Sequence, residues 1–155
     1  MVDATGYVVA SGAGNTWDME PGRPAVFKLL SQDTGGSIAV FEETVPAGAG
    51  TPLHRHRNSD EVLLVQRGEF SFRLGERQMR VSPGAWVFIP RGSIHGWRNI
   101  GAEEGQLANI FAPATDAAAF EEMRLQGRPV PEIDPAVRDE IFQRNGYEFI
   151  TWDWS

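Results

Sequence analysis

The chain has 155 residues, of which 41% are hydrophobic and 23% charged, a balance that fits one globular domain and excludes an intrinsically disordered chain. It has no cysteine, which excludes disulfides and thiolate metal sites, and no apolar run approaches the ~20 residues of a transmembrane helix. A formal net charge of -7 with scattered basic residues argues against nucleic acid or a membrane surface as a partner, and the N-terminus lacks a signal-peptide pattern, so we expect a cytoplasmic protein.

Short apolar runs separated by glycine, proline, asparagine or aspartate fill the middle of the chain and predict strands joined by turns. In EFSFRLG, for example, Phe70, Phe72 and Leu74 alternate with polar residues, as expected for a half-buried strand. About eight such strands, with no room for helical crossovers, predict an all-β sandwich or barrel. The expected strands are 25–31, 36–46, 61–68, 69–75, 77–82, 85–90, 94–100 and 106–113.

Helices are predicted in the last third of the chain. Within 113–127, Thr115 is the expected N-cap of a first helix. Within 131–146, Asp134 is the expected N-cap of a second helix and Pro135 its first residue. We therefore expect a single domain, residues 1–155, with a barrel core at about 25–113 and a helical extension at about 114–155.

The three histidines and one glutamate lie where metal ligands could lie. His54 and His56 are one residue apart, and on an extended strand their side chains share a face. Glu61 shares its strand face with aliphatic residues, so its carboxylate is predicted to face inward, where a metal ion would compensate it. His95 opens another predicted strand. Taken singly, each residue has another interpretation. His54 and His56 could lie in a solvated basic loop, Glu61 at an exposed strand end, and His95 in the core as a hydrogen-bonded histidine.

Two longer motifs contain these four residues. GAGTPLHRHRNSDEVLLVQRG (48–68) reads glycine, five residues, His-x-His, four residues, Glu, six residues, Gly. GAWVFIPRGSIHGWRN (84–99) reads glycine, five residues, Pro-x-Gly, two residues, His, three residues, Asn. Both resemble the two cupin motifs at every defining position. Asn99, which ends the second motif, is expected to stabilise a turn rather than to support the metal.

The resemblance to cupins implies a fold and a cofactor. The fold is a double-stranded β-helix, or jelly-roll, barrel. The cofactor is one divalent transition-metal ion per chain, and Mn, Fe, Co, Ni, Cu and Zn all suit such a nitrogen and oxygen site. The ligands that carry over are His54, His56, Glu61 and His95.

Aromatic side chains are predicted to crowd the interior of the barrel. The candidates for the pocket lining are Phe70, Phe72, Trp97 and Phe111, with ordinary core packing as the alternative for each. A metal in such a lining suits a hydrophobic organic substrate better than a phosphosugar, which would need convergent Lys and Arg. Phe120, Met123 and Leu125, on the first predicted helix, could close the barrel mouth or pack against the outside of the sheet.

Among cupins, the chain most resembles small single-domain proteins of the quercetin 2,3-dioxygenase-like type, through GSIAVFEETVPAGAGTPLHRH and NIFAPATDAAAFEEM. This resemblance implies a dioxygenase that uses O2 on a small aromatic or flavonoid/polyketide-like substrate, with Glu61 as both metal ligand and general base. A redox-neutral cyclase, isomerase or lyase is one alternative, and a non-catalytic module that binds a metal or small molecule is another.

The ends of the chain predict assembly. The segment GYVVA near the N-terminus is a short apolar strand, and the tail YEFITWDWS carries two tryptophans that are expected to anchor it by packing. A barrel of this size must hide its edges, and cupins of this length commonly pair through N-terminal strands, so we expect a homodimer.

Overall fold

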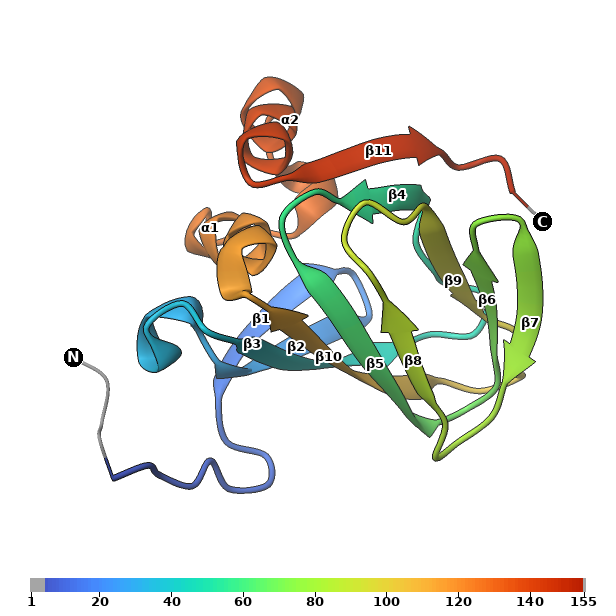
Figure 1. Cartoon of the computed structure of the whole chain (residues 1–155), viewed down its shortest axis with the longest axis horizontal. Helices are drawn as coiled ribbons and strands as arrows, with labels where there is room; N and C mark the ends of the chain where they lie inside the picture. Colours follow the sequence, from blue (N-terminus) through green and yellow to red (C-terminus); the bar gives the residue numbers. More distant parts are fainter. Residues whose placement is uncertain (1–4, 155) are drawn as a thin grey trace.

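The computed structural model describes residues 5–154, which form two antiparallel sheets (Figure 1). The six-stranded sheet has the order β1-β2-β3-β10-β5-β8, and the five-stranded sheet has the order β11-β4-β9-β6-β7. This confirms the all-β prediction and the jelly-roll barrel. The strands are β1 Asn15–Glu20, β2 Arg23–Leu29, β3 Ala39–Val45, β4 Leu53–His56, β5 Asp60–Arg67, β6 Phe70–Leu74, β7 Arg77–Val81, β8 Trp86–Ile89, β9 His95–Asn99, β10 Gly105–Ala112 and β11 Tyr147–Thr151.

Each of the eight expected strands forms, and β1, β4 and β11 join them. In β3 and β10 every second residue is buried, so alternation in the sequence marks the side that faces the barrel interior. The tail forms β11, which pairs with β4 and places Tyr147 opposite His56. Trp154 anchors the end of the tail through a hydrogen bond from Nε1 to the carbonyl of Thr51 (3.0 Å), whereas Trp152 is largely exposed.

Two hydrophobic clusters fill the molecule. One lies between the six-stranded sheet and the helices and includes Phe27, Phe41 and Phe111. The other fills the opposite part of the barrel around Phe70 and Phe72. Both clusters border the cavity described below, because Phe111 belongs to the first and Trp97 to the second.

The helices of the C-terminal extension lie at one end of the barrel (Figure 1), and its strand β11 pairs with β4. Its helices are α1 Ala118–Leu125 and α2 Pro135–Arg144, and short 3-10 helices are η1 Ser31–Thr34, η2 Ala114–Ala117 and η3 Val130–Glu132. Asp134 caps α2 as predicted, accepting hydrogen bonds from the backbone of Ala136 and Val137. The predicted cap Thr115 is wrong: it lies inside η2, and α1 begins without a side-chain cap.

Asp116 fastens this extension to the barrel. Its buried carboxylate accepts hydrogen bonds from the backbone and the side chain of Asn58 (2.8 and 3.0 Å). Its backbone N–H donates to the hydroxyl of Ser59 (3.0 Å). Because these bonds and the β11–β4 pairing hold both ends of the extension, the side chains that it places over the barrel mouth have fixed positions.

Five residues of the two motifs that are not predicted metal ligands have structural roles. Positive φ angles occur at four of the motif glycines, Gly48, Gly68, Gly84 and Gly92. A residue with a side chain would be strained in this backbone conformation. Asn99 donates to the carbonyls of Val45 and Glu103 and accepts from Gly101, so it stabilises a turn as expected. No helix in the described part of the chain is long and apolar enough to span a membrane.

Candidate metal centre

Four buried side chains, which we call the histidine cluster, converge from two strands of the five-stranded sheet and one strand of the six-stranded sheet. His54 and His56 come from β4, Glu61 from β5 and His95 from β9, and one ligand atom of each lies within 4.8 Å of the others. The register brings them together, because His54 lies directly opposite His95. One oxygen of Glu61, Oε2, lies 2.9 Å from His95 Nε2 and 3.3 Å from His56 Nε2.

Backbone carbonyls fix two of the imidazole tautomers. Nδ1 of His54 lies 2.9 Å from the carbonyl of Pro52, and Nδ1 of His95 lies 2.9 Å from the carbonyl of Ser93. A carbonyl oxygen only accepts, so each Nδ1 carries the proton and each Nε2 keeps a lone pair for a ligand. The lone pair of His95 then faces the Glu61 carboxylate at 2.9 Å, and two such acceptors repel each other unless a proton or a metal ion binds between them.

The protonation states also fit a metal ion. Burial, together with the neighbouring His95 and His56, lowers the pKa of His54 well below its usual value, so this imidazole is neutral at pH 7. Burial alone would raise the pKa of Glu61, but its close contacts with the imidazoles of His56 and His95 lower it well below the usual range. A neutral imidazole and an ionised carboxylate are the forms that bind a divalent ion.

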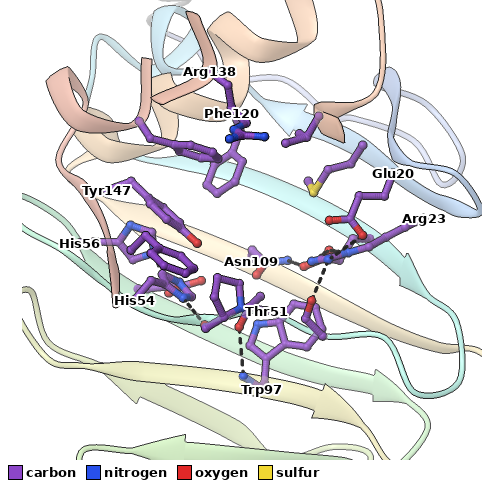
Figure 2. A pocket seen from close by; sticks show the side chains of 18 of the residues that line it. Glu20, Arg23, Thr51, His54, His56, Trp97, Asn109, Phe120, Arg138 and Tyr147 are labelled. Atoms are coloured by element: carbon purple, nitrogen blue, oxygen red, sulfur yellow. Dashed lines mark hydrogen bonds and ion pairs between the residues drawn. The ribbon is translucent and has the colours of Figure 1, made fainter. Parts of the chain in front are cut away.

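A cavity of about 510 Å³ opens over the histidine cluster. Two of the predicted lining residues, Trp97 and Phe111, lie in its wall, whereas Phe70 and Phe72 lie in the core. Phe120, from α1, also lines the cavity, where Figure 2 shows it above the histidines. The other two residues predicted for the barrel mouth do not line it, because Met123 is buried in the core and Leu125 is exposed. The other aromatic residues of the wall are Phe41, Phe142, Tyr147, Phe149 and Trp152. The volume lies in the range of small-molecule sites.

Tyr147 is a wall residue that sequence reasoning missed. Its ring stacks on His54, with centroids 4.7 Å apart and planes 9° apart, and meets His56 edge-on at 5.5 Å. Burial raises the pKa of its hydroxyl, so the group is a neutral hydrogen-bond donor. Figure 2 shows the hydroxyl pointing into the cavity. No local signal in the tail could identify it, because only the β11–β4 register brings it to the histidines.

A second polar group of the wall, which we call the Arg–Glu–Asn network, comprises Arg23, Glu43 and Asn109. Nε and Nη2 of Arg23 bind Glu43 Oε2 at 3.0 and 2.9 Å, and Asn109 Nδ2 donates to Glu43 Oε1 at 3.2 Å. Burial alone would lower the pKa of Arg23, but Glu43 and Glu20 raise it, so the guanidinium stays charged. Glu43 shares the inward face of β3 with Phe41 and Val45, and this is the same signal that identified Glu61.

Comparison with known proteins agrees with the resemblance of the two motifs to cupins. The family model for the cupin domain matches residues 41–111. An uncharacterized protein of Aquifex aeolicus is 33% identical over 93 residues, which cover 59% of this chain and 70% of that protein. The structure of KdgF from Halomonas sp. is 21% identical, with a TM-score of 0.62 over 70% of this chain and 94% of that one, and at this identity it shows the fold alone.

One relative has a named activity. Dimethylsulfoniopropionate lyase DddQ of Ruegeria pomeroyi is 35% identical over 63 residues, or 40% of this chain. The matched segment spans only 31% of that lyase. The likeness is therefore confined to a part of each protein.

Proposed function

The chain belongs to the cupin superfamily, and from this premise we propose that it is a metal-dependent enzyme that converts a small hydroxylated aromatic compound, with dioxygenation as its reaction. The observation that carries the proposal is the convergence of four buried donors at one edge of an aromatic-lined cavity. A structural metal site would be closed by its ligands, whereas this one faces space for a ligand.

The four donors suit a divalent transition-metal ion. His54, His56 and His95 would hold it through Nε2, and Glu61 would hold it through a carboxylate oxygen. When bound, such an ion supplies a Lewis acid and, if it is redox-active, chemistry with O2. The Nδ1–H bonds to Pro52 and Ser93 keep two of the imidazoles oriented whether or not a substrate is present.

Glu61 is the proposed general base. A substrate hydroxyl that enters over the histidines meets an ionised carboxylate, which can accept its proton at a free oxygen lone pair. The aromatic wall excludes water from this transfer and holds a planar ring in place. Tyr147 can donate a hydrogen bond to a substrate oxygen, because its hydroxyl has no partner among the described residues and points into the cavity.

The test is oxygen consumption by metal-loaded protein. A panel of flavonols and dihydroxylated aromatic compounds is incubated in air and under nitrogen, with O2 uptake and product masses measured together. We expect consumption of about one O2 per substrate converted and products that contain both oxygen atoms. Conversion that proceeds equally well under nitrogen would refute dioxygenation.

A redox-neutral lyase is the second candidate, and the partial likeness to the lyase DddQ favours it. The same base, Glu61, would then remove a proton from a substrate whose charge the metal stabilises. The oxygen experiment separates the two candidates, because a lyase yields its product under nitrogen. Tight binding of a compound without any product would indicate a binding module instead.

We also propose that the protein is a homodimer. The prediction of a strand at GYVVA (6–10) is wrong, because the first strand of the described residues is β1. The six-stranded sheet ends at β1, and Val8 in the preceding segment is 92% exposed. A strand from a second copy can pair with such an edge. Light scattering at micromolar concentration should give twice the chain mass of 17.1 kDa, and a monomer mass would refute the dimer.

A further inference from the structure

The Arg–Glu–Asn network lies in the cavity wall at some distance from the histidine cluster. On β10, Phe111 lies opposite Glu61 and Asn109 lies opposite Leu63, two residues farther along β5. Two residues of strand correspond to about 7 Å. Figure 2 shows Asn109 between the histidines and Arg23. The cavity thus has two polar ends with aromatic wall around them.

Arg23 is not free to bind an anion at this end. Two of its nitrogens bind Glu43, while Nη1 donates to the carbonyl of Gly50 (3.1 Å) and lies 3.5 Å from Glu20. The ring of Trp97 lies 4.9 Å from the guanidinium carbon and covers one face of it. Because its charge and most of its donors are already used, a carboxylate or phosphate cannot form a two-pronged pair with it.

Acceptors, by contrast, remain available in the network. A carboxylate only accepts hydrogen bonds, so the amide nitrogen of Asn109 faces Glu43 and its Oδ1 points away. In the described part of the chain this Oδ1 accepts no hydrogen bond, and Asn109 lines the cavity. Glu43 Oε1 accepts only the bond from Asn109 and has capacity for another. A ligand atom that satisfies these acceptors must be a donor.

The donor should be neutral. The charges of Arg23 and Glu43 cancel, with side chains only 6% and 3% exposed. The second carboxylate near Arg23, that of Glu20, is 36% exposed, so water screens its charge. A cation would gain little from a compensated pair and would lose its hydration. A hydroxyl group donates a hydrogen bond at a much smaller desolvation cost. The stacked rings of Phe41 and Phe111, 6.0 Å apart, favour a planar ligand body beside it.

We propose that Asn109 and Glu43 accept a hydrogen bond from a substrate hydroxyl about 7 Å from the oxygen that binds at the histidines. The preferred substrates are therefore planar aromatic compounds with hydroxyl groups at both ends. This inference rests on the proposed function, because it assigns substrate choice within the same cavity. Asn109 is the residue that determines specificity, and Arg23 positions Glu43.

Two probes of one skeleton test the inference on zinc-loaded protein under nitrogen. Both 2,3-dihydroxynaphthalene and 2,3,6-trihydroxynaphthalene carry a metal-binding diol, but only the second has a hydroxyl on the far ring. Calorimetric titration should show the triol binding at least about tenfold more tightly, the value of one good hydrogen bond in a cavity. Zinc content is measured in the same samples.

The variants Asn109→Ala and Asn109→Thr should reduce this preference to less than about twofold while retaining zinc. Threonine suits a strand and can still donate to Glu43, so it serves as the second variant if alanine impairs folding. The matched control is Gln106→Ala, which removes an amide on the outer face of the same strand, where Gln106 binds Glu42. The control should keep the full preference.

Each outcome decides the question. Equal affinity for the two probes, no binding of either probe to zinc-loaded protein, or a preference that survives both Asn109 variants would overturn the inference. A protein that takes up no zinc would refute both the metal-dependent function and this inference. A hydroxyl preference that depends on Asn109, without turnover in the oxygen experiment, would support the binding site and refute the enzyme.

Discussion

The histidine cluster and the Arg–Glu–Asn network lie in the wall of one cavity, but only the network is neutralised by its own side chains. In the network, Arg23 compensates Glu43, and hydrogen bonds hold both. In the cluster, Glu61 faces the Nε2 lone pair of His95, because the carbonyl of Ser93 holds the proton of that ring on Nδ1. The first arrangement is complete without a ligand, and the second requires a cation.

This difference predicts two kinds of response to mutation. Removing a member of the cluster should release the metal and leave the barrel folded, because the cluster contributes donors for an ion. Removing a charged member of the network, Arg23 or Glu43, should reduce stability first, because it leaves the other charge buried and unpaired. The experiments below test this division, from the largest expected effect to the smallest.

The largest effect is expected for His95→Ala. Loss of one of three imidazoles should abolish metal retention through purification, because the remaining donors no longer enclose the ion. Metal content and far-UV circular dichroism are measured together, and His54→Ala is tested in parallel. Loss of the β-fold in both variants would show that the histidines are structural and would remove the contrast with the network.

Glu61→Gln should lower turnover per bound metal by about 10²–10⁴-fold, because an amide cannot accept the substrate proton. It should also weaken metal binding, since a neutral amide oxygen is a poorer donor, so the assay is run with excess metal. Near-normal turnover per metal would reduce Glu61 to a ligand and place the proton acceptor elsewhere.

Glu43→Gln should lower the free energy of unfolding by about 3 kcal/mol, because Arg23 would remain charged and buried with only Glu20 nearby. Urea denaturation measures the change, and metal content should be unaffected. The matched control is Glu69→Gln, which breaks the exposed pair with Arg80 and should have a far smaller effect. Equal losses in the two variants would contradict the assigned role of the network.

Acidification should destabilise the metal-free protein, because the pKa of His54 lies well below its ordinary value of 6.5. As the pH falls below 6.5, the unfolded chain binds a proton at His54 and the folded chain does not, so unfolding becomes more favourable. The slope should reach at most about 1.4 kcal/mol per pH unit. The lowered pKa of Glu61 acts in the same direction, but only below about its ordinary value of 4.5.

Urea titrations at about pH 7.5, 6.5 and 5.5 measure this dependence, which spans the ordinary pKa of a histidine. The variant His54→Gln should have a flatter profile than the wild type over the same range. A wild-type stability that does not change with pH, or an unchanged slope in the variant, would show that His54 does not titrate as described.

The sequence predicted one end of the cavity better than the other. The cluster lies in two motifs with fixed spacing, and alternation placed Glu61 on an inward face. The same alternation places Glu43 and Asn109 inward, so the network could have been found, but no motif marks it. Tyr147 could not be found, because its position depends on the pairing of β11 with a strand about ninety residues earlier.

The helix starts were also predicted only where the signals in the sequence are local. Asp134 and Pro135 are local signals, and they placed the start of α2 correctly. Thr115 is an equally good local signal, but the next residue, Asp116, is hydrogen-bonded to Asn58 and Ser59 of the barrel. The chain therefore forms the 3-10 helix η2 before α1 begins. A capping signal predicts a helix start only where no tertiary contact uses the same residues.

The measurement that tests the central claim most directly is elemental analysis of protein purified without chelators. We expect close to one transition-metal ion per chain, bound by the four donors of the cluster. Binding should be lost in His95→Ala and retained in Asn109→Ala. Protein that carries no metal, and takes up none when Mn, Fe, Co, Ni, Cu or Zn is added, would contradict the account.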